Sequence, residues 1–308
     1  MLLGNKKLPL WKDLVEEFLL EKELNGASER TLSDYRYYLE RFFNGFTGKT
    51  EADLRKRVIE FFSGKLAPAT FNIRRAYLKS FFNWCLRKGI LSSNPINFKR
   101  RKDEGRARAV PKEVIKKLLE LPNRKTFTGL RNFTLILFTL DTGIRPKEAL
   151  SLKVKDFNLE GKEVEVPTFY AKTRKKRILP LSVPTCVWLK RLIKARPKDW
   201  NNEEVPVFCN REGKKLSVAS WSQTLERYSK KLGYKITPYD LRHTFAIYSL
   251  REGMSPFALQ RILGHADLNT TKRYLALTQA DLAIEHRKSS PVKLFLSSRA
   301  GKIPGKLF

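Results

Sequence analysis

The chain has 308 residues and carries 62 Lys and Arg against 31 Asp and Glu, which gives a formal net charge of +31 at pH 7. This excess favours nucleic acid as the partner over general solubility, and the length suits two domains better than one. Because no apolar run reaches the ~18 residues of a membrane helix and the opening residues lack the apolar core of a signal peptide, we expect a cytoplasmic, nucleoid-associated protein without membrane contact.

The first hundred residues predict a small helical bundle. Helical patterns occur in four segments: 10–19, 32–43, 53–63 and 70–89. Either Ser28 or Thr31 can cap the second helix, and Gly89 can end the fourth in a left-handed turn. The many aromatic residues of these segments are expected to form the core rather than a surface on which bases stack.

A basic segment follows the bundle. Residues 99–108, KRRKDEGRAR, include six Lys or Arg and show no apolar periodicity. Such a run is ordinarily a solvated linker, and one this basic can also lie along a phosphate backbone, with Lys99, Arg100 and Arg101 as the contacts. The boundaries that we expect are as follows: a helical domain at 1–98, a linker at 99–110, a second domain at 111–290 and a basic tail at 291–308.

The second domain contains an apolar helix, predicted over 131–141, that stops near Gly143. Pro146 then suits the first turn of another helix, which puts Arg145 at a helix entrance where free backbone N–H groups favour an anion. Glu148 lies on the same helical side and can hold Arg145 by a salt bridge. Taken alone, Arg145 fits a surface arginine that caps a turn as well as it fits an anion-binding residue.

Alternating residues in 163–169 and the apolar run 178–181 predict a β-hairpin. The expected fold class is therefore mainly α with a small β-sheet (α+β) in the second domain, beside a separate N-terminal helical bundle. The turn of the hairpin is strongly basic and includes Lys172, Arg174, Lys175, Lys176 and Arg177. A basic turn is usually solvated, but this one could also enter a DNA groove.

Two further segments carry polar residues: PYDLRHTFA (238–246) and LGHADLNTTKRY (263–274). Tyr239 and Arg242 lie three apart on a helix expected to begin near Pro238, so both can face one pocket, and His243 is four residues from Tyr239. In isolation, His265 after a glycine would be a turn cap. Tyr274 beside an arginine would be a core or interface residue.

Considered together, these segments supply Arg145, Lys172, Arg242, His265 and Tyr274. Two arginines suit a phosphate because each planar, permanently charged fork can hold two phosphate oxygens. The chain resembles the tyrosine recombinase (phage-type integrase) family. The resemblance lies in the order of these five residues, in the residues around each of them and in the nine-residue spacing from His265 to Tyr274. The family pattern is Arg, Lys, His-x-x-Arg, His or Trp, then Tyr. The resemblance is strong over 110–290 and looser over 10–95.

The resemblance implies a site-specific DNA recombinase that cleaves and rejoins strands through a 3′-phosphotyrosyl intermediate. Tyr274 would attack the scissile phosphate, Arg145 and Arg242 would clamp it, and His265 would bond a non-bridging oxygen. Lys172 would protonate the departing 5′ hydroxyl. Since the bond energy is kept and these side chains stabilise the charge, no ATP, metal ion or other cofactor is expected.

Several positions leave alternatives open. Tyr239 stands where the family usually has a histidine, and a phenol can donate a hydrogen bond to phosphate but accepts a proton poorly. His243 is expected to support the site or to be structural. Lys175 and Lys176 rival Lys172 as the proton donor. The scattered cysteines are expected in the core: Cys85, Cys186 and Cys209.

The resemblance also implies partners and domain roles. The bundle would be a SAM-like core-binding domain that closes with the catalytic domain, 111–290, around double-stranded recombination sites. The protein would be a homotetramer on DNA and a monomer off DNA, with a possible accessory directionality protein. A helix is expected at 279–285, and in the tail an apolar group would dock on a neighbouring protomer: Val292, Leu294, Phe295 and Leu296.

Three functions remain to be compared. The first is recombination, either integration and excision of a mobile element or resolution of chromosome dimers; the short segment before the bundle favours a compact, Xer-like form, whereas the ending HRKSSPV resembles mobile-element integrases. The second is DNA relaxation by the same covalent chemistry, as in a type IB topoisomerase. The third is a catalytically silent DNA-binding regulator, against which the five retained motif residues argue.

Overall fold

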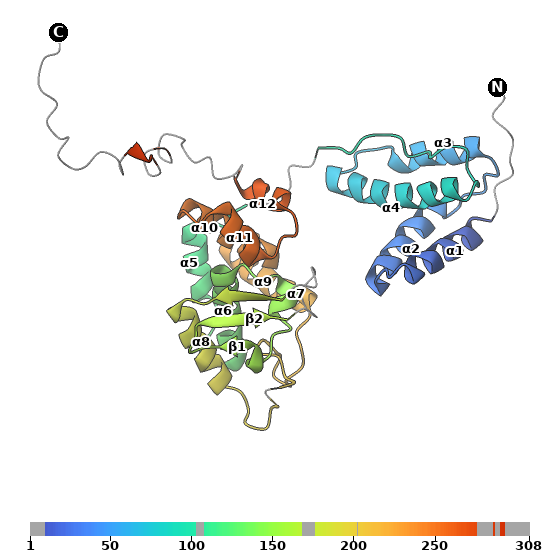
Figure 1. Ribbon diagram of the computed structural model, residues 1–308. Coiled ribbons are helices and arrows are strands. Elements are labelled where there is room, and N and C mark those ends of the chain that lie inside the picture. The colour runs from blue at the N-terminus through green and yellow to red at the C-terminus, as the bar shows by residue number, and fades with distance from the viewer. Residues whose placement is uncertain are drawn as a thin grey trace, which may run out of the picture. The chain divides into compact units, whose positions relative to one another are not determined.

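The computed structural model describes residues 10–102, 108–167, 176–201, 203–275, 286 and 290–292. The chain divides into two compact units, Met1–Arg106 and Ala107–Phe308, whose elements are labelled in Figure 1. Three of the predicted site residues, Lys172, Arg174 and Lys175, lie outside the described residues, as do the helix expected at 279–285 and the tail beyond Val292.

Over its described residues, 10–102, the first unit is a four-helix bundle. Its helices are α1 (Trp11–Leu24), α2 (Glu29–Phe43), α3 (Glu51–Phe62) and α4 (Pro68–Arg87). Ser28 caps α2, because its hydroxyl accepts a hydrogen bond from the Thr31 backbone N–H at 3.3 Å. Gly89 follows α4 with φ +69°. The helix begins at Pro68, earlier than expected, because a proline at the first helical position gives up an N–H that has no helical partner anyway.

Aromatic side chains fill the bundle. Phe18 is fully buried and makes edge-to-face contacts with Phe81 and Trp84, at ring-centroid distances of 5.3 and 5.6 Å. Phe42 and Phe82 are equally buried. The predicted aromatic core is therefore confirmed, and these rings are not free to stack on bases.

The second unit is mainly helical with one small sheet, as expected. Its elements are α5 (Lys112–Glu120), α6 (Phe127–Thr142), α7 (Pro146–Ala149), the 3-10 helix η1 (Val154–Asp156), β1 (Phe157–Asn158), β2 (Glu163–Val166), β3 (Arg177–Pro180), α8 (Val183–Lys194), α9 (Val218–Leu232), α10 (Pro238–Arg251), α11 (Pro256–Leu263) and α12 (Leu268–Leu275). None of the helices in the described ranges is both long and apolar enough to cross a membrane.

The sheet is antiparallel, in the order β1-β2-β3. The predicted hairpin is its β2–β3 pair, in which Val164 faces Leu179, and both side chains are buried. The two-residue strand β1 was not expected, since two residues are too few to show an alternating pattern. The three cysteines are buried and unpaired, as predicted.

Helices α10, α11 and α12 lie together at one end of this unit (Figure 1). They share a small apolar core that includes Phe245, Leu263 and Tyr274. The end of α6 approaches this core at Gly143, which has φ +60°. A Cβ at Gly143 would lie 2.2 Å from the Phe245 ring, so only glycine lets the α6 terminus, and Arg145 beyond it, come this close.

Candidate active site

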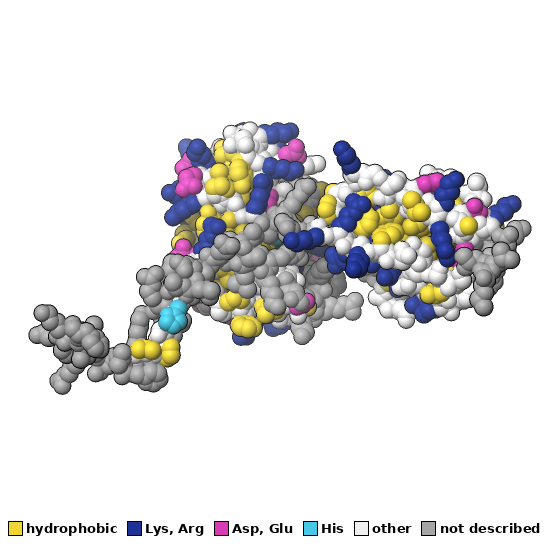
Figure 2. All heavy atoms as spheres, turned by 90° about the horizontal axis from the view of Figure 1, so that it is seen from above, with side chains coloured by type: hydrophobic (Ala, Val, Ile, Leu, Met, Phe, Trp, Pro, Cys, Tyr) yellow, Lys and Arg dark blue, Asp and Glu magenta, His cyan; other side chains and the backbone are white. Residues whose placement is uncertain are grey.

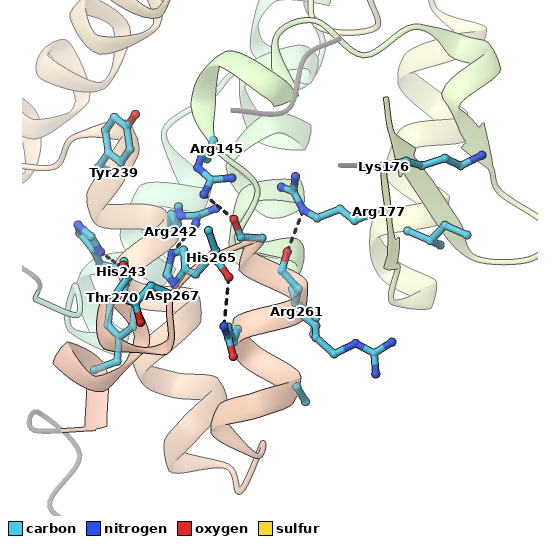
Figure 3. Close-up of a pocket in the computed structure, with 17 residues that line it drawn as sticks. Arg145, Lys176, Arg177, Tyr239, Arg242, His243, Arg261, His265, Asp267 and Thr270 are labelled. Carbon is cyan, nitrogen blue, oxygen red and sulfur yellow. Dashed lines mark hydrogen bonds between the residues drawn. The ribbon is translucent and has the colours of Figure 1, made fainter. Parts of the chain in front are cut away.

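An open pocket of about 1490 Å³ lies where β3, α10, α11, α12 and the residue before α7 meet (Figure 3). Four of the five motif residues line it: Arg145, Arg242, His265 and Tyr274. The fifth, Lys172, is outside the described residues. The pocket is also lined by six further residues singled out from the sequence or carrying charge: Lys176, Arg177, Tyr239, His243, Arg261 and Asp267.

Arg145 is held from two sides. It is the N-cap residue of α7, a single helical turn, and its Nη1 donates to Glu148 Oε1 at 3.1 Å, which is the salt bridge expected from their spacing. Its Nη2 donates to the Gly264 carbonyl oxygen at 2.9 Å. The Arg145 backbone N–H is bonded to Glu148 as well, at 3.2 Å, so the carboxylate already occupies part of this helix entrance.

Glu148 is shared by two guanidinium groups. It is buried, with 1% of its surface exposed, and Arg177 from β3 donates to it through Nη2 at 2.5 Å and Nη1 at 3.3 Å. Burial acts to raise the pKa of Glu148, but the hydrogen bonds and charges of Arg177 and Arg145 outweigh it and lower the pKa below its ordinary value. The sequence suggested Arg177 only as a DNA contact, so its structural partnership with Glu148 was missed.

Arg242 is the most deeply buried cation of the pocket, with 3% of its surface exposed. It donates to the Gly143 carbonyl at 2.6 Å, to the Leu263 carbonyl at 2.9 Å and to His265 Nε2 at 3.0 Å. Burial, and next the positive charge of Arg145, lower the pKa of Arg242 to about 10. The group is still charged at neutral pH, and a phosphate would supply the counter-charge that these neutral partners lack.

The ring of His265 is fixed by a partner at each nitrogen. A guanidinium has no acceptor, so Nε2 must accept from Arg242, and Nδ1–H is then the donor to Thr271 Oγ1 at 2.9 Å. These two hydrogen bonds together fit a neutral imidazole with its proton on Nδ1. In the sequence, nothing distinguishes Thr271, six residues after His265, as the partner.

Tyr274 is buried within α12, with 4% of its surface exposed. Its Oη lies 2.7 Å from Nδ1 of His243, and its ring stacks on that of His265 at 6.4 Å between centroids with planes 11° apart. The chain thus brings α10 and α12 together so that an imidazole from one contacts the phenol of the other. The contact between His243 and Tyr274 was not expected from their separation in the sequence.

Tyr239 and Lys176 occupy the rim of the pocket. Tyr239, in the first turn of α10, is 51% exposed. The Lys176 amine pairs with Glu165 of β2 at 2.7 Å and points away from Arg145, Arg242 and His265 (Figure 3). Lys175 and Lys176 were the alternatives to Lys172 as the proton donor. Lys176 already has a carboxylate partner, and Lys175 lies outside the described residues.

The predicted contacts in the linker lie at the end of the first unit. Lys99 and Arg100 are exposed. The Arg101 guanidinium lies 3.9 Å from the centre of the Phe71 ring and donates to the Leu66 carbonyl at 3.0 Å. Arg101 therefore also packs against the bundle, which the sequence did not indicate.

The site is cationic and contains no clustered metal ligands in the parts of the chain that are described. Five Lys or Arg side chains and one carboxylate, that of Asp267, line the described pocket. No group of three or more His, Cys, Asp or Glu that could hold a metal ion occurs among the described residues. The arrangement suits an anion held by guanidinium groups beside a phenol oxygen.

Comparison with known proteins places this geometry in a family. Residues 108–281 match the model of the phage integrase family. The tyrosine recombinase XerA of Pyrococcus horikoshii is 31% identical over 281 residues, which cover 90% of this chain and 94% of the relative. The tyrosine recombinase XerC of Thermodesulfovibrio yellowstonii is 31% identical over 226 residues, covering 70% of this chain and 73% of the relative.

A solved structure gives the same fold. The Tn1549 transposon integrase in complex with a circular intermediate DNA superposes with a TM-score of 0.75 at 19% identity, covering 92% of this chain and 99% of that chain. The family model spans more than half of the chain, and its range contains every residue that lines the pocket. The chain belongs to the phage integrase family of tyrosine recombinases.

Proposed function

We propose that the protein is a site-specific DNA recombinase that cleaves and rejoins DNA through a covalent bond between Tyr274 and a 3′ phosphate. The observation that carries this proposal is the meeting of a phenol oxygen and two guanidinium groups, those of Arg145 and Arg242, in one open pocket. Guanidinium forks bind phosphate oxygens, and the phenol is the oxygen nucleophile beside them.

In the cleavage step, Tyr274 Oη forms a bond to phosphorus while the bond from phosphorus to the 5′ oxygen breaks. Arg145, Arg242 and His265 stabilise the charge that develops on the non-bridging oxygens. Their groups are already positioned by Glu148, by backbone carbonyls and by Thr271, so little reorganisation accompanies the reaction. Attack by a 5′ hydroxyl of another strand reverses the step and joins that strand.

The departing 5′ oxygen requires a proton. We assign its donor to Lys172, which lies in the sequence between β2 and β3, since the first residues of β3 line the pocket. A lysine amine surrounded by cationic arginines is a better proton donor than an isolated one, because neighbouring positive charge favours its neutral form. Lys176 is the less suitable alternative because it pairs with Glu165.

The proposed partner is double-stranded DNA, bound by a tetramer that acts on two sites. Lys and Arg side chains are spread over the visible face of both units and outnumber the acidic ones there (Figure 2), in line with the net charge of +31. Among the structural relatives, lambda integrase is a tetramer bound to a Holliday junction. The bundle, 1–98, is assigned to core binding and the second domain, 111–290, to catalysis.

Covalent capture tests the proposal without a defined target sequence. The full-length protein is incubated, without added metal, with a pool of duplexes that have a randomised centre and a nick at staggered positions. Because the short fragment beyond the cleavage site diffuses away, cleaved DNA stays attached to the protein. The pool is denatured, and DNA that remains on the protein is recovered and sequenced.

The matched variants are Tyr274→Phe and Tyr248→Phe. Tyr248 is a tyrosine of α10, but its hydroxyl donates to the Val110 carbonyl and it does not line the pocket. We expect recovery from the wild type and Tyr248→Phe, with enrichment of one sequence, and none from Tyr274→Phe. Equal recovery from Tyr274→Phe, or binding without any covalent product from the wild type, would refute the proposal.

A further inference from the structure

His243 Nδ1 lies 2.7 Å from Tyr274 Oη, and the tautomer of the imidazole sets the direction of this hydrogen bond. In the tautomer that carries its proton on Nε2, the lone pair of Nδ1 accepts the hydrogen of the phenol. A phenol hydrogen-bonded to an imidazole nitrogen at this distance is arranged for proton transfer.

Two other titratable groups of the described pocket, His265 and Tyr239, do not meet the same requirement. The His265 ring stacks on the phenol, and its two nitrogens are engaged by Arg242 and Thr271 rather than directed at the phenol oxygen. Tyr239 is itself a phenol, lies half exposed at the rim of the pocket and offers no basic nitrogen. Among these groups, His243 alone presents a basic nitrogen to Tyr274 Oη.

We propose that His243 is the general base that removes the proton of Tyr274 during strand cleavage, so that α10 supplies the base one residue after Arg242 instead of at Tyr239. This inference rests on the recombinase function proposed above. The helix allows it because residues 239 and 243 are four apart and lie on the same face.

The proton and electron balance is simple. As Tyr274 Oη bonds to phosphorus, its proton moves to His243 Nδ1 and makes an imidazolium. The bond from phosphorus to the 5′ oxygen breaks, and that oxygen takes a proton from the donor assigned to Lys172. In the joining step, the 5′ hydroxyl returns a proton to the lysine, and His243 returns its proton to the phenol as the bond to Tyr274 breaks.

The charges around the pair favour this exchange. Cations from several elements line the described pocket: Arg145, Lys176, Arg177, Arg242 and Arg261. Asp267 is the carboxylate among the described lining residues, and Tyr239 and His265 are the other titratable groups there. A cationic surrounding disfavours imidazolium before DNA binds and favours a phenolate. Bound phosphate partly neutralises the cations, which then makes the imidazolium easier to form.

The first test needs no DNA. The chain has three histidines, His243, His265 and His286, so ¹⁵N-histidine NMR of the full-length protein can be assigned with single substitutions. At pH 7.5 we expect His243 to be neutral with its proton on Nε2, and Tyr274→Phe to shift its Nδ1 resonance but not the resonances of exposed His286. A proton on Nδ1, or an imidazolium at this pH, would overturn the inference.

The second test uses the captured DNA sequence and compares His243→Gln with wild type. Glutamine can keep a hydrogen bond to the phenol but does not titrate. We expect adduct formation at pH 7 to fall about 10²- to 10⁴-fold, the usual contribution of a general base. The wild-type rate should rise with pH and level off once His243 is neutral, whereas the rate of His243→Gln should keep rising to pH 9, because the phenolate must then form unaided.

His286→Gln is the matched histidine control and should keep the wild-type rate and pH profile. If His243→Gln forms the Tyr274-dependent adduct with the wild-type rate and profile, the histidine only positions the phenol; the general-base inference then fails and the recombinase function stands. If the wild type forms no Tyr274-dependent adduct, the proposed function fails and the inference fails with it.

Discussion

The two units of this chain bury different kinds of side chain. Among the described residues of the bundle, Asn72 is the one buried polar side chain, and apart from Cys85 the rest of the core is aromatic and aliphatic. The second unit buries Arg131, Glu148 and Arg242 as well as hydroxyl groups. Burying a charge costs free energy that hydrogen bonds and counter-charges only partly offset. The difference means that the second unit bears the free-energy cost of buried charges, one of which, Arg242, lines the pocket, whereas the core of the bundle does not.

A large loss of reaction rate is expected from changing a buried arginine inside the pocket. Arg242→Lys keeps a charge but loses the fork that reaches two carbonyls and His265. We expect adduct formation to fall about 10²- to 10³-fold, the range for losing a donor to a developing oxyanion. Rates of covalent adduct formation measure this directly.

Arg131→Lys is the matched control for Arg242→Lys. Arg131 is also buried in the second unit, but it donates to the Cys209 carbonyl and to Asn132 and does not line the pocket. It should lose stability and keep the rate per folded molecule. An equal loss of rate in both variants would mean that burial of arginine, and not its place in the pocket, determines the effect.

Glu148→Gln should be the most destabilising change at the site. It leaves Arg145 and Arg177 without their carboxylate, and removing one partner of a buried ion pair costs about 3–5 kcal/mol. Because the folded-state pKa of Glu148 is lowered, its contribution is present above the unfolded value near ~4.3 and is lost as pH falls through the folded pKa. Denaturant unfolding from pH 7 down to pH 3 should show the variant losing less stability in acid than wild type.

Phe81→Ala in the bundle is the comparison for Glu148→Gln in the second unit. It removes a buried ring, which costs about 3–5 kcal/mol, with no titratable group involved. Its loss of stability should therefore be the same over the pH range in which the loss in Glu148→Gln varies. A parallel pH dependence in the two variants would contradict the contrast between the units.

Inorganic phosphate should stabilise the second unit and not the bundle, and this difference in stability should be smaller than the preceding ones. An anion that binds only the folded pocket stabilises it by about 1.4 kcal/mol at ten times its dissociation constant. Amide hydrogen exchange of the full-length protein should show added protection in α10 and none in α2, and Arg242→Lys should reduce the added protection. Equal protection of both helices would indicate nonspecific binding to the positive surface.

The smallest effect is expected in the linker. Lys99→Ala and Arg100→Ala each remove an exposed charge, so each should lower the slope of log binding constant against log salt by about 0.9 if it contacts one phosphate. The rate of adduct formation at saturating DNA should not change. An unchanged salt slope in both variants would remove the linker from the DNA interface.

Much of the fold was predictable because its signals are local. Ser28 and Pro238 mark helix starts, Gly143 marks a helix end, and the alternation at 163–166 marks a strand. Local signals fail where an element is very short or where two signals compete. The strand β1 has two residues, and Ser28 and Thr31 were equally suited as caps until the structure distinguished them.

The site was predictable in composition but not in its internal contacts. Motif order predicted Arg145, Arg242, His265 and Tyr274 as site residues, and the structure brings these four into one pocket. Spacing along one helix predicted the ion pair of Arg145 with Glu148. The contact of Arg177 with Glu148 spans 29 positions, and that of His243 with Tyr274 spans 31. Such contacts depend on how elements pack, so no spacing in the sequence indicates them.

The most direct test of the central claim is to identify the atoms joined in the covalent product. The captured adduct is digested with protease and nuclease, and the remaining nucleotide-bearing peptide is sequenced by mass spectrometry. The account predicts one modified peptide, with the nucleotide joined through its 3′ phosphate to the oxygen of Tyr274 and a free 5′ hydroxyl on the released strand. Attachment at another residue, or through a 5′ phosphate, would contradict it.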